Sequence, residues 1–350
     1  QFRQTVCITG QHRQMLDQVL SLFKISPDVD LDVMKNDQDL FDVTSEVLLG
    51  MKEVLQERKP DLVLVQGDTT TTFAASLASF YLGIPVGHVE AGLRTWNLHS
   101  PFPEEANRCL ATRIASYHFC PTESNKQNLL AEGVDSGNIY VTGNTVIDAL
   151  LWVRDQVGNE PAYLWEKDCG TLVEILNDSH PIILITGHRR ENFGEGLREI
   201  CGAISVLGSR HSDWHFIYPV HMNPNVSGPV HEILGGRNNV HLMGPLDYAP
   251  FVFLMTRATL ILTDSGGVQE EAPSLGKPVL VMRENTERPE AVDAGTVRLV
   301  GAKGNSIVAG VEDIMSNKDK YNGMSRALNP YGDGKTAARI LDIIIERNAL

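Results

Sequence analysis

Short apolar, β-branched runs recur along the chain, and each is followed by a polar or glycine-containing turn and then by a helical pattern. Runs that are apolar throughout are typical of strands buried on both faces, and strands that alternate with helices form parallel sheets. The sequence therefore predicts an α/β protein. The expected strands are residues 6–9, 61–66, 86–89, 118–120, 140–141, 182–186, 215–219, 240–243, 260–263 and 278–282.

The length of 350 residues exceeds that of a typical single domain, so two domains are expected. The pattern weakens within 146–180, around Gly158-Asn159-Glu160-Pro161, and strands lie on both sides of this stretch. We expect one doubly wound, Rossmann-like domain over 1–147 plus 335–350, whose last helix packs back on it, and a second over 148–334. Because residues 5–9 already form a strand pattern, we expect the first domain to lack its opening strand and turn.

Charge and composition narrow the function. The net charge of −14 argues against a nucleic-acid or anionic-membrane partner, because both favour basic surfaces. No apolar run reaches the roughly 18–20 residues that cross a bilayer. The five cysteines are scattered, without a C-x-x-C, so neither a disulfide framework nor a thiolate metal site is expected, and a reducing, cytoplasmic location fits.

The sequence also lacks the motifs of common cofactor and metal sites. No G-x-G-x-x-G follows an expected strand, so NAD is not indicated. No H-E-x-x-H motif or cluster of Cys and His residues appears, so no metal held by the protein is predicted. We therefore expect an enzyme without a cofactor, or a binding protein.

Three acidic residues of the first domain lie at the ends of expected parallel strands or at the start of a helix. Asp68 follows one strand, Glu90 follows the next, and Glu104 opens a helix after a proline-rich loop. Ligands bind at the carboxyl ends of such strands, and carboxylates in different environments suit acid–base chemistry. Each also has a structural explanation: Asp68 as a helix cap, Glu90 paired with Arg94, and Glu104 at a helix dipole.

The first strand of the second domain is followed by Gly187-His188-Arg189-Arg190-Glu191-Asn192. Doubly wound domains often bind phosphate at this place, and a histidine with two arginines suits a diphosphate. The alternative is a solvated basic turn.

A later strand leads through Ser265-Gly266-Gly267 into a helix that carries Glu271 one turn further on. Glycines let the backbone approach a ligand closely, and N–H groups at a helix start favour an anion. Glu271 is placed for sugar or ribose hydroxyls, and Arg288, after another strand, could add a cation or form a surface ion pair. This segment predicts a nucleotide diphosphate site.

Taken together, the motifs resemble those of the bacterial non-hydrolysing UDP-N-acetylglucosamine 2-epimerases, from about residue 5 to the end. The departure is at the start, where the family's opening strand and its Gly-Thr-Arg-Pro-Glu turn do not appear. The matching segments are QHRQMLDQVL (11–20), GDTTTT (67–72), GHVEAGLRT (87–95), PFPEEANR (101–108), PTES (121–124), GNTVIDAL (143–150), GHRREN (187–192), YPVHMNPNV (218–226), TDSGGVQEEAPSLGKPVLVMR (263–283) and TERPEAV (286–292).

The resemblance implies a glycosyltransferase-B-like fold with two domains facing a cleft, a homodimer and no redox cofactor. It implies reversible conversion of UDP-N-acetylglucosamine to UDP-N-acetylmannosamine: UDP leaves C1 as C2 loses its proton, and UDP re-adds to 2-acetamidoglucal. It also implies a second UDP-N-acetylglucosamine bound as an activator.

Residue roles follow from the same resemblance, although it does not say which carboxylate removes the C2 proton. The catalytic group would be Asp68, Glu90, Glu104 and His188; UDP would contact Phe251, Ser265, Gly266, Gly267, Glu271 and Arg288; and the activator would contact Gln11, Gln14, Arg189 and His221.

Three other functions remain open at this point. A retaining glycosyltransferase of the same fold would share the nucleotide site but would need an acceptor groove. A hydrolysing epimerase would release free N-acetylmannosamine. An inactive nucleotide-sugar-binding subunit would keep only the UDP site. The polysaccharide pathway that uses the product is not indicated.

Overall fold

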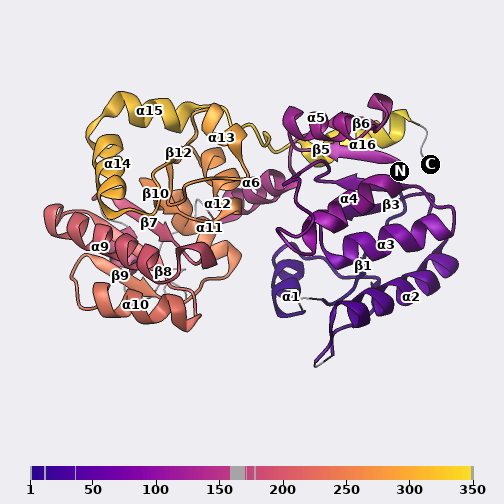
Figure 1. Ribbon diagram of the computed structural model, residues 1–350, viewed down its shortest axis with the longest axis horizontal. Helices are drawn as coiled ribbons and strands as arrows, with labels where there is room; N and C mark the ends of the chain where they lie inside the picture. Colours follow the sequence, from indigo (N-terminus) through magenta and orange to yellow (C-terminus); the bar gives the residue numbers. More distant parts are fainter. Residues whose placement is uncertain are drawn as a thin grey trace. The chain divides into compact units, whose positions relative to one another are not determined.

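The computed structural model describes residues 2–11, 13–35, 37–157, 170, 172–176 and 179–347, without the side chains of residues 14, 15 and 173. The chain divides into two compact units (Figure 1): unit 1 is Gln1–Thr145 with Gly334–Leu350, and unit 2 is Val146–Asp333. The segment 158–161, where the sequence pattern weakens, lies outside the described residues.

Unit 1 contains a four-stranded parallel sheet in the order β3-β4-β5-β6 and a separate parallel pair, β1-β2. Its elements are β1 (Cys7–Ile8), α1 (Arg13–Leu22), β2 (Val29–Asp30), α2 (Leu40–Arg58), β3 (Val63–Gln66), α3 (Thr70–Tyr81), β4 (Val86–Val89), α4 (Glu104–Ile114), β5 (Tyr117–Cys120), α5 (Glu123–Ala131), η1 (Ser136–Asn138), β6 (Ile139–Val141) and α16 (Thr336–Glu346).

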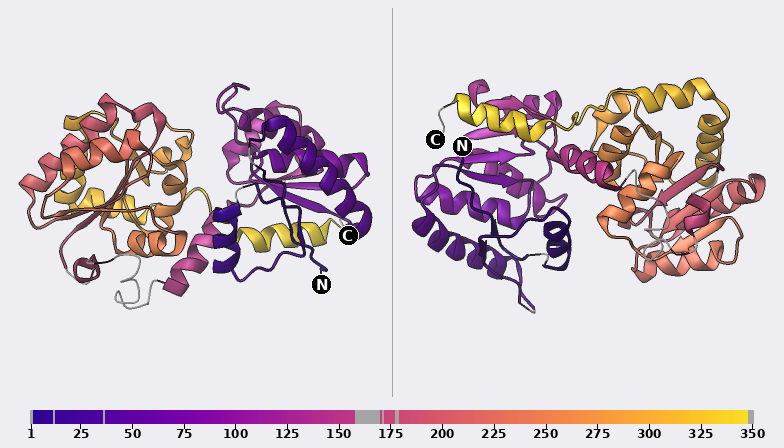
Figure 2. Two further views of the ribbon diagram at one scale, coloured as in Figure 1. Left: turned by 90° about the horizontal axis from the view of Figure 1, so that it is seen from below. Right: turned by 180° about the vertical axis from the view of Figure 1, so that it is seen from behind.

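Helices cover both faces of this sheet. On one face, α2 and α3 pack against Val65 and Val86 of β3 and β4. On the other, Ile340 and Ile344 of α16 pack against Val89 and Phe119; this helix is yellow in Figure 2 and lies along the sheet formed by much earlier residues. The last helix therefore belongs to the core of unit 1.

Unit 2 contains a six-stranded parallel sheet in the order β12-β11-β10-β7-β8-β9. Its elements are α6 (Thr145–Val157), which begins at the last residue of the first segment of unit 1, α8 (Leu172–Leu176), β7 (Ile182–Thr186), η3 (Arg190–Asn192), α9 (Glu195–Arg210), β8 (His215–Pro219), α10 (Pro224–Leu234), β9 (Val240–Met243), α11 (Tyr248–Arg257), β10 (Leu260–Thr263), α12 (Gly266–Glu271), η4 (Ala272–Leu275), β11 (Val279–Val281), α13 (Pro289–Asp293), β12 (Val297–Leu299), α14 (Gly304–Ser316) and α15 (Lys318–Arg326).

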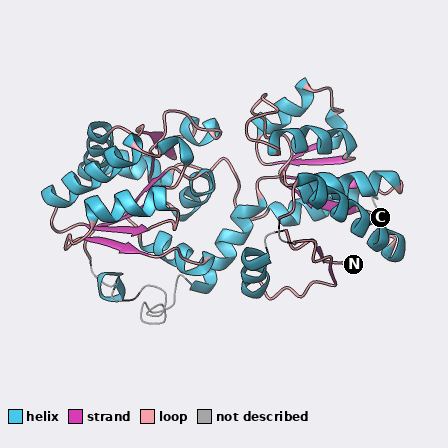
Figure 3. Ribbon diagram, turned by 60° about the horizontal axis from the view of Figure 1, so that its bottom comes forward, coloured by secondary structure: helices cyan, strands magenta, loops and turns pink. Residues whose placement is uncertain are grey.

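The strand order of unit 2 is that of the Rossmann fold, in which the chain reverses direction across the sheet between the first and fourth strands. Here those strands are β7 and β10, which pair directly, and helices cover both faces of the sheet (Figure 3). Ligands of such sheets bind at the carboxyl ends of the strands beside this reversal. The loops after β7 and β10 are therefore where unit 2 is expected to hold a ligand.

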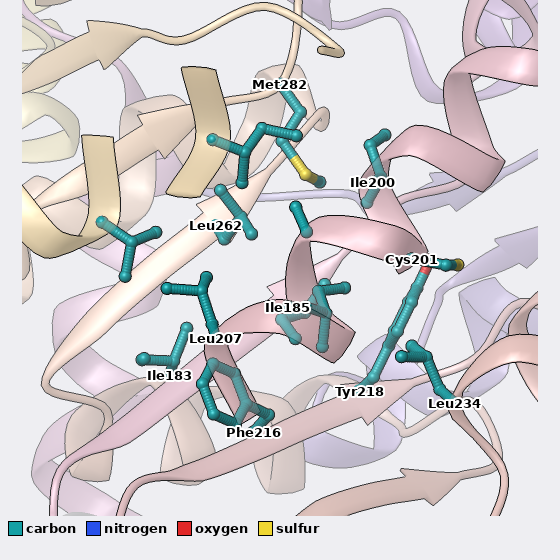
Figure 4. Packing of buried hydrophobic residues seen from close by; sticks show 14 of the residues in the cluster. Ile183, Ile185, Ile200, Cys201, Leu207, Phe216, Tyr218, Leu234, Leu262 and Met282 are labelled. Atoms are coloured by element: carbon teal, nitrogen blue, oxygen red, sulfur yellow. The ribbon is translucent and has the colours of Figure 1, made fainter. Parts of the chain in front are cut away.

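The core of unit 2 lies between this sheet and α9, α10 and α14. Figure 4 shows Phe216 and Tyr218 of β8 beside Ile183 and Ile185 of β7, and these side chains are fully buried. Tyr218 also donates a hydrogen bond from its hydroxyl to the Gly187 carbonyl, at 2.9 Å. The core thus reaches the loop after β7 and fixes its first residue.

Each expected strand is present, with ends that differ by up to two residues, and the α/β class with parallel sheets is confirmed. Two short strands were missed, β2 and β12. Neither carries the continuous apolar run used to recognise strands, since β2 is Val-Asp and β12 is Val-Arg-Leu. Within the described ranges, no helix is both long and apolar enough to span a bilayer.

Candidate active site

In unit 1 the loops after β3 and β4 are tied together at Gly67. Its N–H donates to the Val89 carbonyl at 3.0 Å, and its carbonyl lies 2.8 Å from His88 Nε2. Gly67 has φ of +71°, which favours glycine, and a Cβ added there would lie 3.5 Å from Glu90 Oε2. Asp68 comes directly after this residue, so Glu90 Oε2 lies beside the residue that precedes Asp68. The catalytic roles of Asp68 and Glu90 stay predictions.

Asp68 is held by the first turns of α4. Arg108 donates from Nε and Nη2 to Asp68 Oδ2, at 3.0 and 2.6 Å, and Asn107 Nδ2 donates to the Asp68 carbonyl at 2.9 Å. The Asp68 side chain is 28% exposed, whereas that of Arg108 is 9% exposed. Both bonds from Arg108 end on Oδ2, and among the described residues no hydrogen bond ends on the other oxygen, Oδ1.

Arg108 also binds a second carboxylate, that of Glu105. Arg108 Nη1 donates to Glu105 Oε2 at 2.9 Å, and the other Glu105 oxygen accepts the N–H groups of Thr95 and Trp96, both at 3.0 Å. The Glu105 side chain is only 1% exposed. Glu105 is therefore a structural group that fixes Arg108 and the loop after β4.

Glu104, the first residue of α4, differs from its neighbour. Among the described residues, its Oε2 atom is buried and has no hydrogen-bond partner. Positions four apart share one face of a helix, so Glu104 lies on the face of α4 that carries Arg108. A buried carboxylate oxygen without a donor is free to accept a proton or a hydrogen bond from a ligand. The structure thus brings Glu104 to the side of α4 that contacts Asp68.

Arg94 has a structural role, but not the one considered from sequence. Its fully buried side chain bonds to both oxygens of Glu132, to the Leu93 carbonyl at 2.7 Å and to Thr112 Oγ1 at 2.7 Å. The alternative considered from sequence, in which Arg94 pairs with Glu90, does not hold, because the guanidinium binds Glu132.

In unit 2 the loops after β7 and β10 are joined by Asp264, which is fully buried. Its carboxylate accepts the backbone N–H of His188 at 3.0 Å, that of Arg189 at 2.9 Å and the Asn192 side-chain amide at 3.1 Å. All three donors are uncharged N–H groups. Asp264 thus fixes the Gly-His-Arg-Arg-Glu-Asn loop at the reversal of strand order.

His188 is presented by that loop, with 43% of its side chain exposed. Its ring stacks on His221 with a centroid separation of 5.5 Å. Burial lowers the pKa of His188; Asp264 opposes this shift, while His221 and Arg189 add to it. This shift favours the neutral imidazole, whereas an anion bound beside it would favour the protonated form.

The Ser265-Gly266-Gly267 segment leads from β10 into α12 as expected, and Arg288 lies against it. A Cβ added at Gly266 would lie 3.0 Å from Arg288 Cζ, so a larger residue there would displace the guanidinium. Arg288 Nε donates to Glu270 Oε1 at 2.7 Å. The predicted UDP-binding residues Ser265, Gly266, Gly267 and Arg288 are thus gathered at one edge of the sheet.

Glu271 lies at the end of α12, where Tyr248 donates a hydrogen bond to its Oε1. Burial raises the pKa of Glu271 to about 7; the nearby Glu270 adds to the shift, and the Tyr248 bond opposes it. Phe251, the residue expected at the uracil, is half-buried on α11 three positions after Tyr248, and such positions share a helix face. Phe251 therefore lies on the side of α11 that faces Glu271.

The four residues expected to bind an activator are divided between the units. Gln11 Oε1 accepts a hydrogen bond from Thr71 Oγ1 at 3.1 Å in unit 1, and Gln14 lies in α1 with its side chain outside the described residues. Arg189 and His221 lie beside His188 in unit 2. Their role stays a prediction.

Sequence reasoning missed the residues that hold the others in place: His88, Glu105, Arg108, Asp264 and Tyr248. Arg108 and Asp264 stand within matched motifs, but a motif does not say which member touches a ligand and which supports it. In the part of the chain that is described, no three His, Cys, Asp or Glu side chains are grouped so that they could hold a metal ion.

Two units of parallel α/β structure, with polar loops at the carboxyl ends of β3, β4, β7 and β10, define a protein of the glycosyltransferase-B-like class. Residues 1–345 match the sequence profile of the family described as UDP-N-acetylglucosamine 2-epimerase. The chain belongs to this family.

Individual proteins that are similar to this chain carry the same family name or bind UDP. The UDP-N-acetylglucosamine 2-epimerase of Yersinia pestis is 58% identical over 340 residues, which cover 97% of this chain and 90% of the relative. The crystal structure of the Neisseria meningitidis UDP-GlcNAc 2-epimerase bound to UDP-GlcNAc has a TM-score of 0.87 and 50% identity, covering 98% of this chain and 91% of that one. S. aureus MnaA, solved with UDP, has a TM-score of 0.84 and 41% identity, covering 95% and 87%.

Proposed function

We propose that the chain is a non-hydrolysing UDP-N-acetylglucosamine 2-epimerase that forms UDP-N-acetylmannosamine reversibly. Unit 2 would hold UDP and unit 1 would supply the proton chemistry. The observation that carries the proposal is the buried oxygen of Glu104, which has no donor among the described residues, on the face of the helix that binds Asp68. Two carboxylates in such different surroundings suit an acid–base pair.

In the proposed reaction a carboxylate of unit 1 takes the proton from C2, and the electron pair of that bond forms the C1–C2 double bond. The C1–O bond breaks, and UDP leaves with its electron pair. In the second half, a UDP oxygen re-forms the bond to C1 while a proton is delivered to the opposite face of C2. The cycle is redox-neutral and consumes no water.

The proposed residue roles follow the environments of the side chains. Glu104 and Asp68 exchange the C2 protons, with Arg108 orienting Asp68, and Glu90 shapes the sugar site beside Gly67. His188 contacts the departing diphosphate, whose charge would favour protonation of its imidazole. Ser265, Gly266, Gly267, Arg288, Glu271 and Phe251 hold UDP.

The test uses UDP-N-acetylglucosamine in D₂O without NAD, with C2 followed by NMR. The expected products are UDP-N-acetylmannosamine and substrate that carry deuterium at C2, with the sugars still linked to UDP. Free N-acetylmannosamine as the main product would replace the proposal with a hydrolysing epimerase. Binding of UDP without any exchange at C2 would replace it with an inactive binding subunit.

The proposal extends to regulation and assembly. UDP-N-acetylglucosamine would also act as activator through Gln11, Gln14, Arg189 and His221, so its addition should accelerate turnover of UDP-N-acetylmannosamine. A hyperbolic rate curve without this acceleration would contradict an activator. The proposed homodimer should sediment at twice the chain mass of 38.6 kDa, and a monomer at assay concentrations would exclude it.

A further inference from the structure

A fully buried imidazole lies behind the carboxylates of unit 1 and takes no direct part in the reaction proposed above. His88 is the third residue of β4 and has no exposed surface. Side chains alternate across a strand, so His88 faces the same side of the sheet as Val86, which packs in the apolar cluster under α2 and α3. A polar ring at such a position needs a partner to offset its desolvation.

The partner is the backbone of the catalytic loop. His88 Nε2 lies 2.8 Å from the Gly67 carbonyl oxygen. Because a carbonyl only accepts hydrogen bonds, Nε2 must carry the hydrogen, and in the neutral ring Nδ1 then bears the lone pair. Nδ1 is buried without a hydrogen-bond partner among the described residues. Burial lowers the pKa of His88 to about 4, so the ring does not exchange protons near neutral pH.

Together with a backbone hydrogen bond, this bond holds Gly67 on both sides, and we call the two bonds the Gly67 clasp. The N–H of Gly67 donates to the Val89 carbonyl of β4 at 3.0 Å, and its carbonyl accepts from His88, so β4 holds both polar groups of this residue. Asp68 follows Gly67 and Glu90 follows Val89. Glu90 has φ of +64°, a region that side-chain-bearing residues seldom adopt. Rotation of the Gly67 peptide would move Asp68 relative to Glu90.

We propose that His88 is a positioning residue for the epimerisation: its Nε2–H holds the Gly67 peptide and thereby sets the spacing between Asp68 and Glu90. The inference rests on the proposed function for its activity readout, and on the hydrogen bond for its geometry. Small misplacements of reacting groups can lower a rate by about a hundredfold, so one hydrogen bond at this place has a large effect.

The chain offers a matched control in His118. It pairs in register with His88 on the next strand, is 2% exposed, and also has a buried Nδ1 without a partner among the described residues. Burial lowers its pKa to about 4 as well. The backbone hydrogen-bond partner of His118 is Ala115 rather than Gly67. The two histidines therefore share burial and chemistry but differ in the contact that the proposal invokes.

Four variants separate positioning from stability. Gln can place an amide N–H near the position of Nε2, whereas Asn is too short and Leu has no donor. We expect kcat to fall by roughly 10- to 100-fold in His88→Leu and His88→Asn, but by less than about threefold in His88→Gln. His118→Leu should retain kcat within about twofold even if it lowers the unfolding midpoint. UDP affinity should stay within about twofold throughout, because unit 2 is untouched.

The outcomes are distinct. If the wild-type protein exchanges no deuterium at C2, the proposed function is wrong, whereas the hydrogen bond between His88 and Gly67 is unaffected. Wild-type activity together with equal kcat losses in His88→Gln and His88→Asn, or in His88→Leu and His118→Leu, overturns the positioning role. If the Leu variants do not fold, ¹⁵N NMR of the wild-type imidazole decides: a hydrogen on Nε2 at pH 7 supports the clasp, and a hydrogen on Nδ1 instead overturns it.

Discussion

Asp68 in unit 1 and Asp264 in unit 2 occupy similar places, each just after a parallel strand at the ligand edge of its sheet. Their surroundings differ. Asp68 is partly exposed and binds a guanidinium through one oxygen, and the other oxygen has no donor among the described residues. Asp264 is fully buried, and its hydrogen-bond donors are three uncharged N–H groups of one loop. An acid at a strand end is therefore partly exposed in one unit, where we propose that it reacts, and supports a loop in the other.

The largest expected effect concerns the proposed acid–base groups of unit 1. Glu104→Gln keeps the size of the side chain but removes its capacity to take a proton. We expect kcat to fall by about 10²- to 10⁴-fold, with UDP affinity nearly unchanged, because general acid–base catalysis contributes on that scale. Deuterium exchange at C2 and calorimetric titration with UDP measure the two quantities.

Glu105→Gln is the control on the neighbouring residue. Glu105 accepts two backbone N–H groups and one bond from Arg108, so this change should lower the unfolding midpoint, whereas Glu104→Gln should not. Equal loss of turnover and of UDP binding in Glu104→Gln would make Glu104 a structural residue.

The second test concerns the supporting half. Asp264→Ala leaves three N–H donors without their acceptor, and we expect a loss of about 2–4 kcal/mol in the free energy of unfolding of unit 2. Asp68→Ala should cost less than this, because Asp68 is partly exposed and Arg108 keeps its bond to Glu105. Urea unfolding followed by tryptophan fluorescence compares the two. A larger loss in Asp68→Ala would reverse the distinction drawn above.

The third test uses pH on unit 2. The folded-state pKa of Glu271, about 7, lies above the ordinary value of 4.5, so its neutral form favours folding below pH 4.5 and that advantage is lost as the pH rises through 7. The free energy of unfolding of Glu271→Gln, relative to wild type, should rise by about 1–2 kcal/mol from pH 5 to pH 8. This figure allows for the loss of the charge-assisted bond from Tyr248. Unfolding midpoints at the two pH values measure this, and a constant difference would refute a titrating Glu271.

The smallest expected effect is at an exposed ion pair of unit 2. Asp313 bonds to Arg298 at 2.7 Å and to Lys320, and all three side chains are substantially exposed. Exposed pairs are weak because water and salt screen them. Asp313→Asn should leave the unfolding midpoint and turnover unchanged within error. A clear loss would mean that ion pairing alone, without burial or a fixed loop, stabilises this protein.

Much of the fold followed from the sequence because buried parallel strands require continuous apolar runs, which β7 and β10 have in full. The short strands β2 and β12 escaped because two or three pairing residues, one of them charged, leave no such run. The helix packed by Ile340 and Ile344 was expected on the first domain, and it lies there.

The site was predictable at the level of loops but not of individual roles. Asp68, Glu90 and Glu104 were expected together; Glu90 lies beside Gly67, which precedes Asp68, and Glu104 lies on the helix that binds Asp68, while their joint role stays a prediction. Nothing in the spacing distinguishes Glu104 from Glu105, because adjacent helix positions point in different directions and only the tertiary contacts decide which side is buried against donors.

The return of α16 to unit 1 has a consequence for synthesis of the chain on the ribosome. Strands β4 and β5 are made early, but Ile340 and Ile344, which cover Val89 and Phe119, emerge only after every residue of unit 2 has been translated. Unit 2 is one uninterrupted segment and can complete its core first. The face of the unit 1 sheet that carries Val89 and Phe119 stays uncovered during that interval, so the core of unit 1 is the last to be completed.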